Sequence, residues 1–90
     1  GILDKNSFNQ SFTIYPNPSE GVFNIMFKGI EGYLQIKVMD IQGNDYRHYE
    51  VLGLNSLTTK QLDLKELPAG VYLISFSGKD FYQVKKIVIQ

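Results

Sequence analysis

The sequence predicts an all-β fold, a two-layer antiparallel β-sandwich of about seven strands. Val, Ile, Thr, Phe and Tyr make up a third of the 90 residues and pack well on pleated surfaces, whereas the chain has a single alanine. Short runs that alternate between apolar and polar residues are separated by turn residues at roughly regular spacing. No helical segment long enough for a crossover lies between them, so antiparallel connections and two packed sheets follow.

The alternating runs predict strands at 12–15, 22–28, 33–41, 45–51, 61–64, 71–77 and 81–89. The first strand ends because Pro16 and Pro18 have no amide hydrogen to give to a ladder, and Gly21 turns the chain with a positive φ. The second strand carries Phe or Ile at every other position. The third alternates Leu, Ile and Val with Gln and Lys. Each of these two strands therefore has one face for the core.

The middle of the chain predicts a hairpin and an edge. Residues 40–44 form a tight turn with Gly43 in the left-handed conformation. The strand at 45–51 is polar, which favours the edge of a sheet. Residues 53–60 form either a loop or a weak pairing segment before the short strand at 61–64.

The last third predicts a central strand and an irregular one. One helical turn is expected at 65–67. The strand at 71–77 starts apolar on both faces, which is typical of a central strand. The final strand at 81–89 breaks its own alternation, and a β-bulge near Lys85 and Lys86 would restore its register.

Composition limits both the organisation and the partners. One domain at 12–90 follows residues 1–11, which form a polar linker or a segment added for expression. Nine basic and nine acidic residues give zero net charge, which excludes a dominant electrostatic affinity for nucleic acid. Cysteine is absent, and no apolar run approaches the roughly 20 residues of a membrane helix. These residues contain no basic start followed by an apolar stretch, so we expect any signal peptide to lie in a longer precursor.

The residues predict no catalytic, metal or cofactor site, and hence no enzyme. His48 lies in a polar strand and has no evident nucleophile as partner. Asp40, Asn44 and Asp45 around Gly43 faintly resemble a calcium loop, but they lack its ligand spacing, so a hairpin is favoured. A glycosidase-like pair of carboxylates is a minor alternative in so short a chain.

The tyrosines leave a second function open. They could form a carbohydrate-stacking platform of a binding or adhesion module appended to a larger secreted enzyme, although cross-strand packing is the favoured interpretation. The tyrosines concerned are Tyr15, Tyr33, Tyr46, Tyr49 and Tyr82.

The segment Leu67-Pro68-Ala69-Gly70-Val71-Tyr72 indicates the kind of sandwich. A Leu, a turn and then a Tyr that opens a central strand resemble the tyrosine corner of immunoglobulin-like domains. There the phenol hydroxyl bonds to upstream backbone. The segment therefore predicts an immunoglobulin-like β-sandwich.

Three stretches in order resemble a known family over about residues 12–90. They are Phe12-Thr13-Ile14-Tyr15-Pro16-Asn17-Pro18 with Gly21; Val38-Met39-Asp40-Ile41-Gln42-Gly43; and Leu62-Asp63-Leu64 with 67–74, ending in Lys86-Ile87-Val88-Ile89. In this order they resemble the C-terminal sorting domain (type A) of the type IX secretion system of Bacteroidota.

The resemblance implies an address rather than an activity. Such a domain directs a cargo that precedes it in the parent chain through the periplasm to the cell surface or beyond. Components of the secretion system at the outer membrane read it, and a sortase-like peptidase usually removes it afterwards. The cleavage would fall upstream of the folded domain, within residues 1–11.

The resemblance also implies which residues matter. Candidates for recognition are Gly70, Tyr72, Lys85, Lys86, Ile87, Val88, Ile89 and Gln90. The turn residues that match the family are taken as structural: Tyr15, Pro16, Asn17, Pro18, Gly21, Asp40 and Gly43. A receptor could read an exposed terminal strand by adding a strand of its own. The same exposed edge makes a weak homodimer through edge strands possible.

Overall fold

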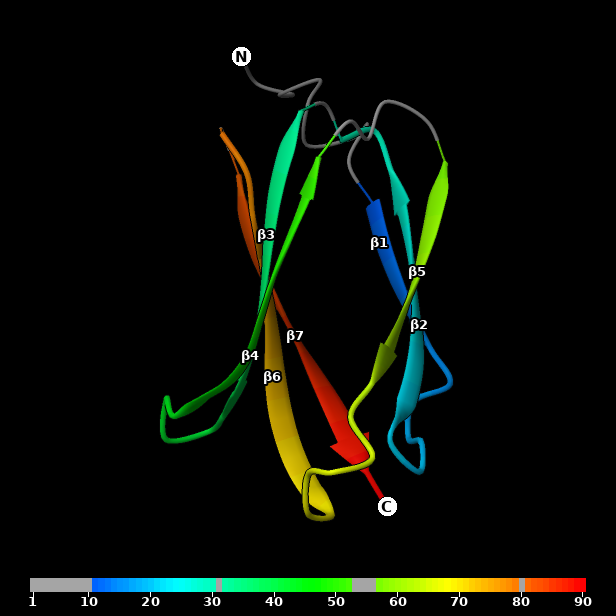
Figure 1. The fold of residues 1–90 in the computed structure, drawn as a ribbon, viewed down its shortest axis with the longest axis vertical. Helices are drawn as coiled ribbons and strands as arrows, with labels where there is room; N and C mark the ends of the chain where they lie inside the picture. Colours follow the sequence, from blue (N-terminus) through cyan, green and yellow to red (C-terminus); the bar gives the residue numbers. More distant parts are fainter. Residues whose placement is uncertain (1–10, 31, 53–56, 80) are drawn as a thin grey trace, which may run out of the picture.

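The computed structural model of the chain describes residues 11–30, 32–52, 57–79 and 81–90 and is all-β. Three strands form one sheet in the order β1-β2-β5 and four form the other in the order β4-β3-β6-β7, with antiparallel pairing throughout. The strands are β1 Ser11–Tyr15, β2 Val22–Lys28, β3 Tyr33–Asp40, β4 Asp45–Leu52, β5 Thr58–Asp63, β6 Gly70–Ser77 and β7 Tyr82–Ile89. The two sheets form two layers (Figure 1). The predicted sandwich is confirmed. Its strand order is that of the seven-stranded immunoglobulin fold except that the fourth strand, β4, pairs with β3 and not with β5.

Most strand limits agree with the prediction, and β5 resolves an open alternative. It begins at Thr58, because Thr58–Lys60 pairs with Ile25–Phe27 of β2. The segment 53–60, predicted as a loop or a weak pairing segment, is therefore paired with β2 at its end. Its residues 53–56 lie outside the described residues. The predicted helical turn at 65–67 is a single hydrogen-bonded turn, in which the Leu67 amide donates to the Leu64 carbonyl (3.0 Å).

Phenylalanine side chains join the two layers. Phe12 of β1 stacks on Phe76 of β6 with ring centroids 4.3 Å apart. Phe27 of β2 meets both rings edge-on, at 5.7 and 6.2 Å. All three are buried. The core also contains the alternating inward residues of β2 and β3 and further apolar residues from the second half of the chain: Leu62, Leu64, Tyr72, Ile74, Ile87 and Ile89. Each buried Phe stabilises the fold by about 1.5–3 kcal/mol.

The tyrosine corner is present. Tyr72 is buried, and its hydroxyl donates a 2.6 Å hydrogen bond to the Pro68 carbonyl four residues upstream. Its strand, β6, lies between β3 and β7, as its apolar start predicts. This bond fixes the path of the chain where it crosses from the β5 layer to the β6 layer.

The bulge predicted near Lys85 and Lys86 is wrong. β6 and β7 pair without a shift from Ser77–Tyr82 to Gly70–Ile89, and the register shift of this sheet lies between Val38 and Met39 instead. β7 is an edge strand, so its inner face can carry polar residues: Gln83 and Lys85 lie there, half-buried. Inward-pointing charge of this kind is a known protection of sheet edges.

Candidate recognition surface at the terminal strand

The turn between β1 and β2 closes part of the free edge of β7. The Asn17 side chain bonds to the β7 backbone in both directions: its amide donates to the Lys86 carbonyl, and its carbonyl accepts from the Val88 amide, each at 3.0 Å. Pro16 and Pro18 flank it and end β1, so the turn is free to cross to the other sheet. One side chain thus replaces a missing neighbouring strand.

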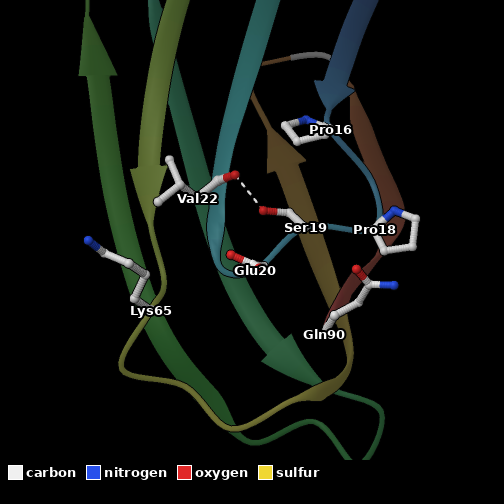
Figure 2. A pocket seen from close by; sticks show the side chains of 7 residues that line it. All are labelled: Pro16, Pro18, Ser19, Glu20, Val22, Lys65 and Gln90. Atoms are coloured by element: carbon white, nitrogen blue, oxygen red, sulfur yellow. Dashed lines mark hydrogen bonds between the residues drawn. The ribbon is translucent and has the colours of Figure 1, made fainter.

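Ser19 extends this contact with its backbone. Its amide donates to the Val88 carbonyl (3.0 Å), and its carbonyl accepts from the Gln90 amide (2.8 Å). The Ser19 hydroxyl donates to the Val22 carbonyl at 2.6 Å, drawn in Figure 2, and the residue is buried. We call the Asn17 and Ser19 bonds to β7 the clasp.

The clasp divides the edge of β7 into a closed and an open half. In an antiparallel ladder, residues that face the partner strand with both backbone groups alternate with residues that face away. The backbone amide and carbonyl of Val88 face away from β6, because the clasp binds both of them. By the same alternation, the backbone groups of Lys86, Val84 and Tyr82 also face away from β6. Among the described residues, β7 pairs beyond the clasp only with β6, so the outward groups of Tyr82 and Val84 stay open.

The structure separates the candidate recognition residues by exposure. Tyr72, Ile87 and Ile89 are buried in the core, with at most 5% of their surface exposed. Lys86 and Gln90 are exposed. Gly70, Lys85 and Val88 are half-buried. Another protein can therefore contact the second group and part of the third in the folded domain, but not the first.

Two adjacent cross-strand pairs form a patch on the outer face of the four-stranded sheet. Val71 lies opposite Val88, and Leu73 opposite Lys86. Val71 is 42% exposed, although it is apolar and sits on a central strand. We call these four residues the β6–β7 patch. It combines an apolar surface with one positive charge.

A shallow hollow of about 420 Å³ lies beside the clasp (Figure 2). It is lined by Pro16, Pro18, Ser19, Glu20, Val22, Lys65 and Gln90. Gly21 lies in the turn behind it with φ +127°, and a Cβ there would stand 2.9 Å from the Lys65 Cα. Glycine is therefore required for the turn to pack against the segment that follows β5.

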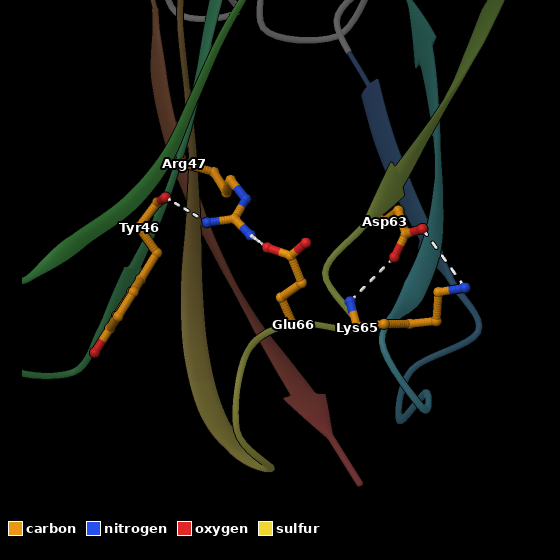
Figure 3. A network of polar contacts seen from close by, with 5 residues as sticks. All are labelled: Tyr46, Arg47, Asp63, Lys65 and Glu66. Carbon is orange, nitrogen blue, oxygen red and sulfur yellow. Dashed lines mark hydrogen bonds and ion pairs between the residues drawn. The ribbon is translucent and has the colours of Figure 1, made fainter.

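Two exposed ion pairs involve the segment that follows β5, and one of them reaches β4 in the other sheet. Arg47 of β4 contacts Glu66 after β5 at 3.2 Å, and Lys65 lies 3.6 Å from Asp63 (Figure 3). Glu66 is 88% exposed. An exposed pair of this kind contributes at most about 1 kcal/mol.

The hairpin after β3 uses its acidic residue to hold the turn. The Asp40 carboxylate accepts bonds from the Gln42 amide and from the backbone and side chain of Asn44, at 2.8–2.9 Å, and from the Tyr46 hydroxyl at 3.0 Å. These bonds, above all that from the Asn44 side chain, lower the pKa of Asp40 to about 2, and the Asp40 bond raises the pKa of Tyr46. Gly43 has φ +90°, as predicted. The hairpin interpretation, rather than a calcium loop, accounts for these residues.

The other candidates do not come together. His48 is exposed on the outer face of β4. Tyr15 lies in the three-stranded sheet, whereas Tyr49 points inward and packs against the core, where burial raises its pKa. Tyr46 packs edge-on against Tyr72. Tyr15, Tyr46 and Tyr49 therefore do not form one platform. No metal-binding group of His, Asp or Glu occurs in the described ranges.

The comparison with protein families decides the identity. The family described as the secretion system C-terminal sorting domain matches residues 13–90. The chain belongs to this family. It is a C-terminal sorting signal for type IX secretion, which directs proteins to the cell surface or the extracellular space and interacts with the type IX machinery. No curated protein matches the chain. In the described part, no helix is long and apolar enough to cross a membrane.

For this sorting domain, the sequence pointed to the terminal strand and the Tyr15–Pro18 turn as separate features. The structure brings them together, because Asn17 contacts Lys86 and Val88 across 69 and 71 positions of sequence. The sequence indicates Asn17 only as a turn residue and carries no signal for the bonds of Ser19. The position of polar Asn17 between two prolines is a sequence signal for a turn contact, but it does not reveal that the contact is with β7.

Proposed function

We propose that the type IX machinery reads this sorting domain through the β6–β7 patch and Gln90, on the outer side of the terminal strand. The observation that carries the proposal is the exposure of Lys86 and Val71 beside the buried Ile87 and Ile89. The two isoleucines hold β7 to the core, and the side chains that alternate with them, Lys86 and Val88, face outward. No catalytic step in the domain is needed.

The chemistry of the patch defines the complementary surface. Three aliphatic side chains and one ammonium fit a partner surface that is apolar with an acidic group at its margin. Strand addition along Lys86–Gln90 is disfavoured, because the clasp already occupies that edge. Recognition of this segment therefore depends on side chains.

An export assay tests the proposal. A reporter with a periplasmic export signal is fused before this chain, and its appearance at the surface of a type IX-competent bacterium is measured. Deletion of 86–90 should abolish export, and Val71→Asp should lower it strongly. Surface delivery that is unchanged by the deletion contradicts the proposal.

Two neighbouring lysines supply a matched control. Lys86 is exposed in the patch, whereas Lys85 points to the inner side of the same strand. Each of the variants Lys86→Gln and Lys85→Gln removes one positive charge, from adjacent positions. Because only Lys86 lies on the outer face, Lys86→Gln should lower export several-fold and Lys85→Gln should lower it less. Equal effects would show that net charge, and not the outer face, is read.

We also propose that a sortase-like peptidase removes the domain after transport of the preceding cargo, at the outer membrane. Backbone pairing with β2 begins at Ser11, opposite Lys28. Cleavage inside the paired strand β1 is disfavoured, so we place the cleaved bond upstream of it, within residues 1–11. Mass spectrometry of the released domain should find its first residue no later than Ser11.

We also propose that two copies of this domain associate weakly through their edge strands. Each sheet ends in strands that have one neighbour only. Such edges offer unpaired amide and carbonyl groups to another strand. Sedimentation velocity at rising concentration should show reversible association.

A further inference from the structure

The open half of β7 has a short, defined set of unpaired groups. These are the amides and carbonyls of Tyr82 and Val84, and the Lys86 amide, whose carbonyl the clasp holds. The side chains beside them are unusually exposed for their type, at 65% for Tyr82 and 44% for Val84. This half of the edge therefore presents both backbone groups and apolar surface to a neighbour.

We propose that this open half pairs with the same segment of a second copy, antiparallel and centred on Val84. The inference rests on the self-association included in the proposed function and gives it a place and a register. With Val84 opposite Val84, Tyr82 lies opposite Lys86 of the second copy. Four of the five open groups on each edge then meet an open partner. The fifth, the Tyr82 amide, faces the Lys86 carbonyl of the second copy, which already accepts the Asn17 bond but has a second lone pair. The two four-stranded sheets become one continuous sheet.

The side chains agree with this register. On the outer face, the two Val84 side chains meet, and each Tyr82 ring meets the ammonium of the other copy's Lys86, an attractive cation–π arrangement. On the inner face, each Lys85 lies opposite Gln83 of the other copy. A register centred on Lys85 would instead place two lysines directly opposite each other, which is destabilising.

The surrounding structure sets the length of the pairing. A second strand cannot pass Lys86, because the clasp occupies the edge from there onward. In the proposed register the strand of the second copy does not have to pass Lys86, because its Tyr82, the first residue of β7, lies opposite Lys86. The hairpin that joins β6 to β7 precedes Tyr82 in the chain. In this hairpin the Gly78 amide donates a 3.1 Å hydrogen bond to the Phe81 carbonyl. The chain of the second copy thus turns away where the clasp stands.

The other three edges fit a second copy less well. β4 carries Arg47, His48 and Glu50 along its edge, and alternating charge of this kind protects edges from pairing. β1 has five residues and ends at two prolines. β5 reads Thr-Thr-Lys-Gln-Leu-Asp and offers no exposed apolar pair.

Cysteine cross-linking tests the location. The chain has no cysteine, so Val84→Cys introduces the only thiol. Residues opposite each other in a hydrogen-bonded antiparallel pair have Cα atoms about 5.5 Å apart, which a disulfide can span. Under mild oxidation Val84→Cys should form the disulfide dimer at least several-fold faster than Val71→Cys, which is equally exposed but lies on central β6.

Two further variants test the register and the strength. A mixture of Tyr82→Cys and Lys86→Cys chains should form the mixed disulfide faster than either chain forms its own. Because the contact is far smaller than the roughly 1,200 Å² of a stable interface, association should appear only at high concentration. Val84→Lys should remove it by placing like charges opposite each other, whereas Val71→Lys should not.

The outcomes are distinct. A wild-type chain that stays monomeric at every concentration contradicts self-association itself. A chain that dimerises while Val84→Cys reacts no faster than Val71→Cys contradicts this edge alone. If Val84→Cys is slow and Val84→Lys lowers export, the open edge binds an extended segment of another protein, and self-pairing is wrong.

Discussion

Removing the Asn17 side chain should loosen the terminal strand more than its exposed position suggests. Asn17→Ala deletes the bonds to the Lys86 carbonyl and the Val88 amide, both 3.0 Å long. A net hydrogen bond contributes about 0.5–1.5 kcal/mol, and water can replace part of these two, so we expect a loss of about 1–2 kcal/mol. With a urea m-value of roughly 1 kcal/mol per molar for a small domain, the unfolding midpoint should fall by about 1–2 M.

Amide exchange measured by NMR locates the effect. The Val88 amide loses its acceptor in Asn17→Ala and should exchange faster, while the Gln90 amide keeps its bond to Ser19. Asn17→Asp retains an acceptor for Val88 but no donor for Lys86, and should lie between the wild type and Asn17→Ala. Unchanged protection of the Val88 amide in Asn17→Ala would refute the clasp.

Asn44→Ala is the matched control. It also removes an exposed turn asparagine, whose side chain donates a 2.9 Å bond to Asp40. That turn lies at the β3–β4 hairpin and does not contact β7. Its loss should lower stability without changing exchange at Val88. An equal change at Val88 in both variants would assign the effect to global unfolding.

Three further predictions concern single residues. Gly21→Ala should destabilise by more than about 1 kcal/mol in urea unfolding, because its φ is +127° and the new Cβ would meet the Lys65 backbone. Tyr72→Phe should fold but lose about 1 kcal/mol with its bond to Pro68, and a loss near zero would contradict the corner. The pKa of Asp40 is lowered from 3.8 to about 2, so its stabilising effect is full above pH 4 and is lost as the pH falls through 2. Asp40→Asn should flatten the pH dependence of stability in that window, and an unchanged slope would argue against the turn bonds.

Local signals made most of the strands predictable. The alternation in β2 and β3 placed their core residues correctly, since one face of each strand is covered by the other sheet. Gly43 was predictable because a two-strand hairpin needs a positive φ at its turn. The tyrosine corner spans only four residues, so it too could be recognised from the sequence.

The contacts of β7 were not predictable in the same way. The clasp joins residues 69 and 71 positions apart, and no local pattern encodes such a pairing. The broken alternation of β7 predicts a bulge only if both halves of the strand need an apolar inner face. An edge strand does not need an apolar inner face along its whole length. The Lys85 side chain therefore points inward while β7 pairs with β6 without a register shift.

The two halves of β7 meet different physical demands. The half from Lys86 onward has a closed edge and two buried isoleucines, so only its outer side chains are available to a partner. The half before it has an open edge and exposed Tyr82 and Val84, so its backbone is available as well. A substitution in the first half should therefore act through side-chain chemistry. In the second half a change of backbone, such as Val84→Pro, should remove pairing even though it leaves the β6–β7 patch intact.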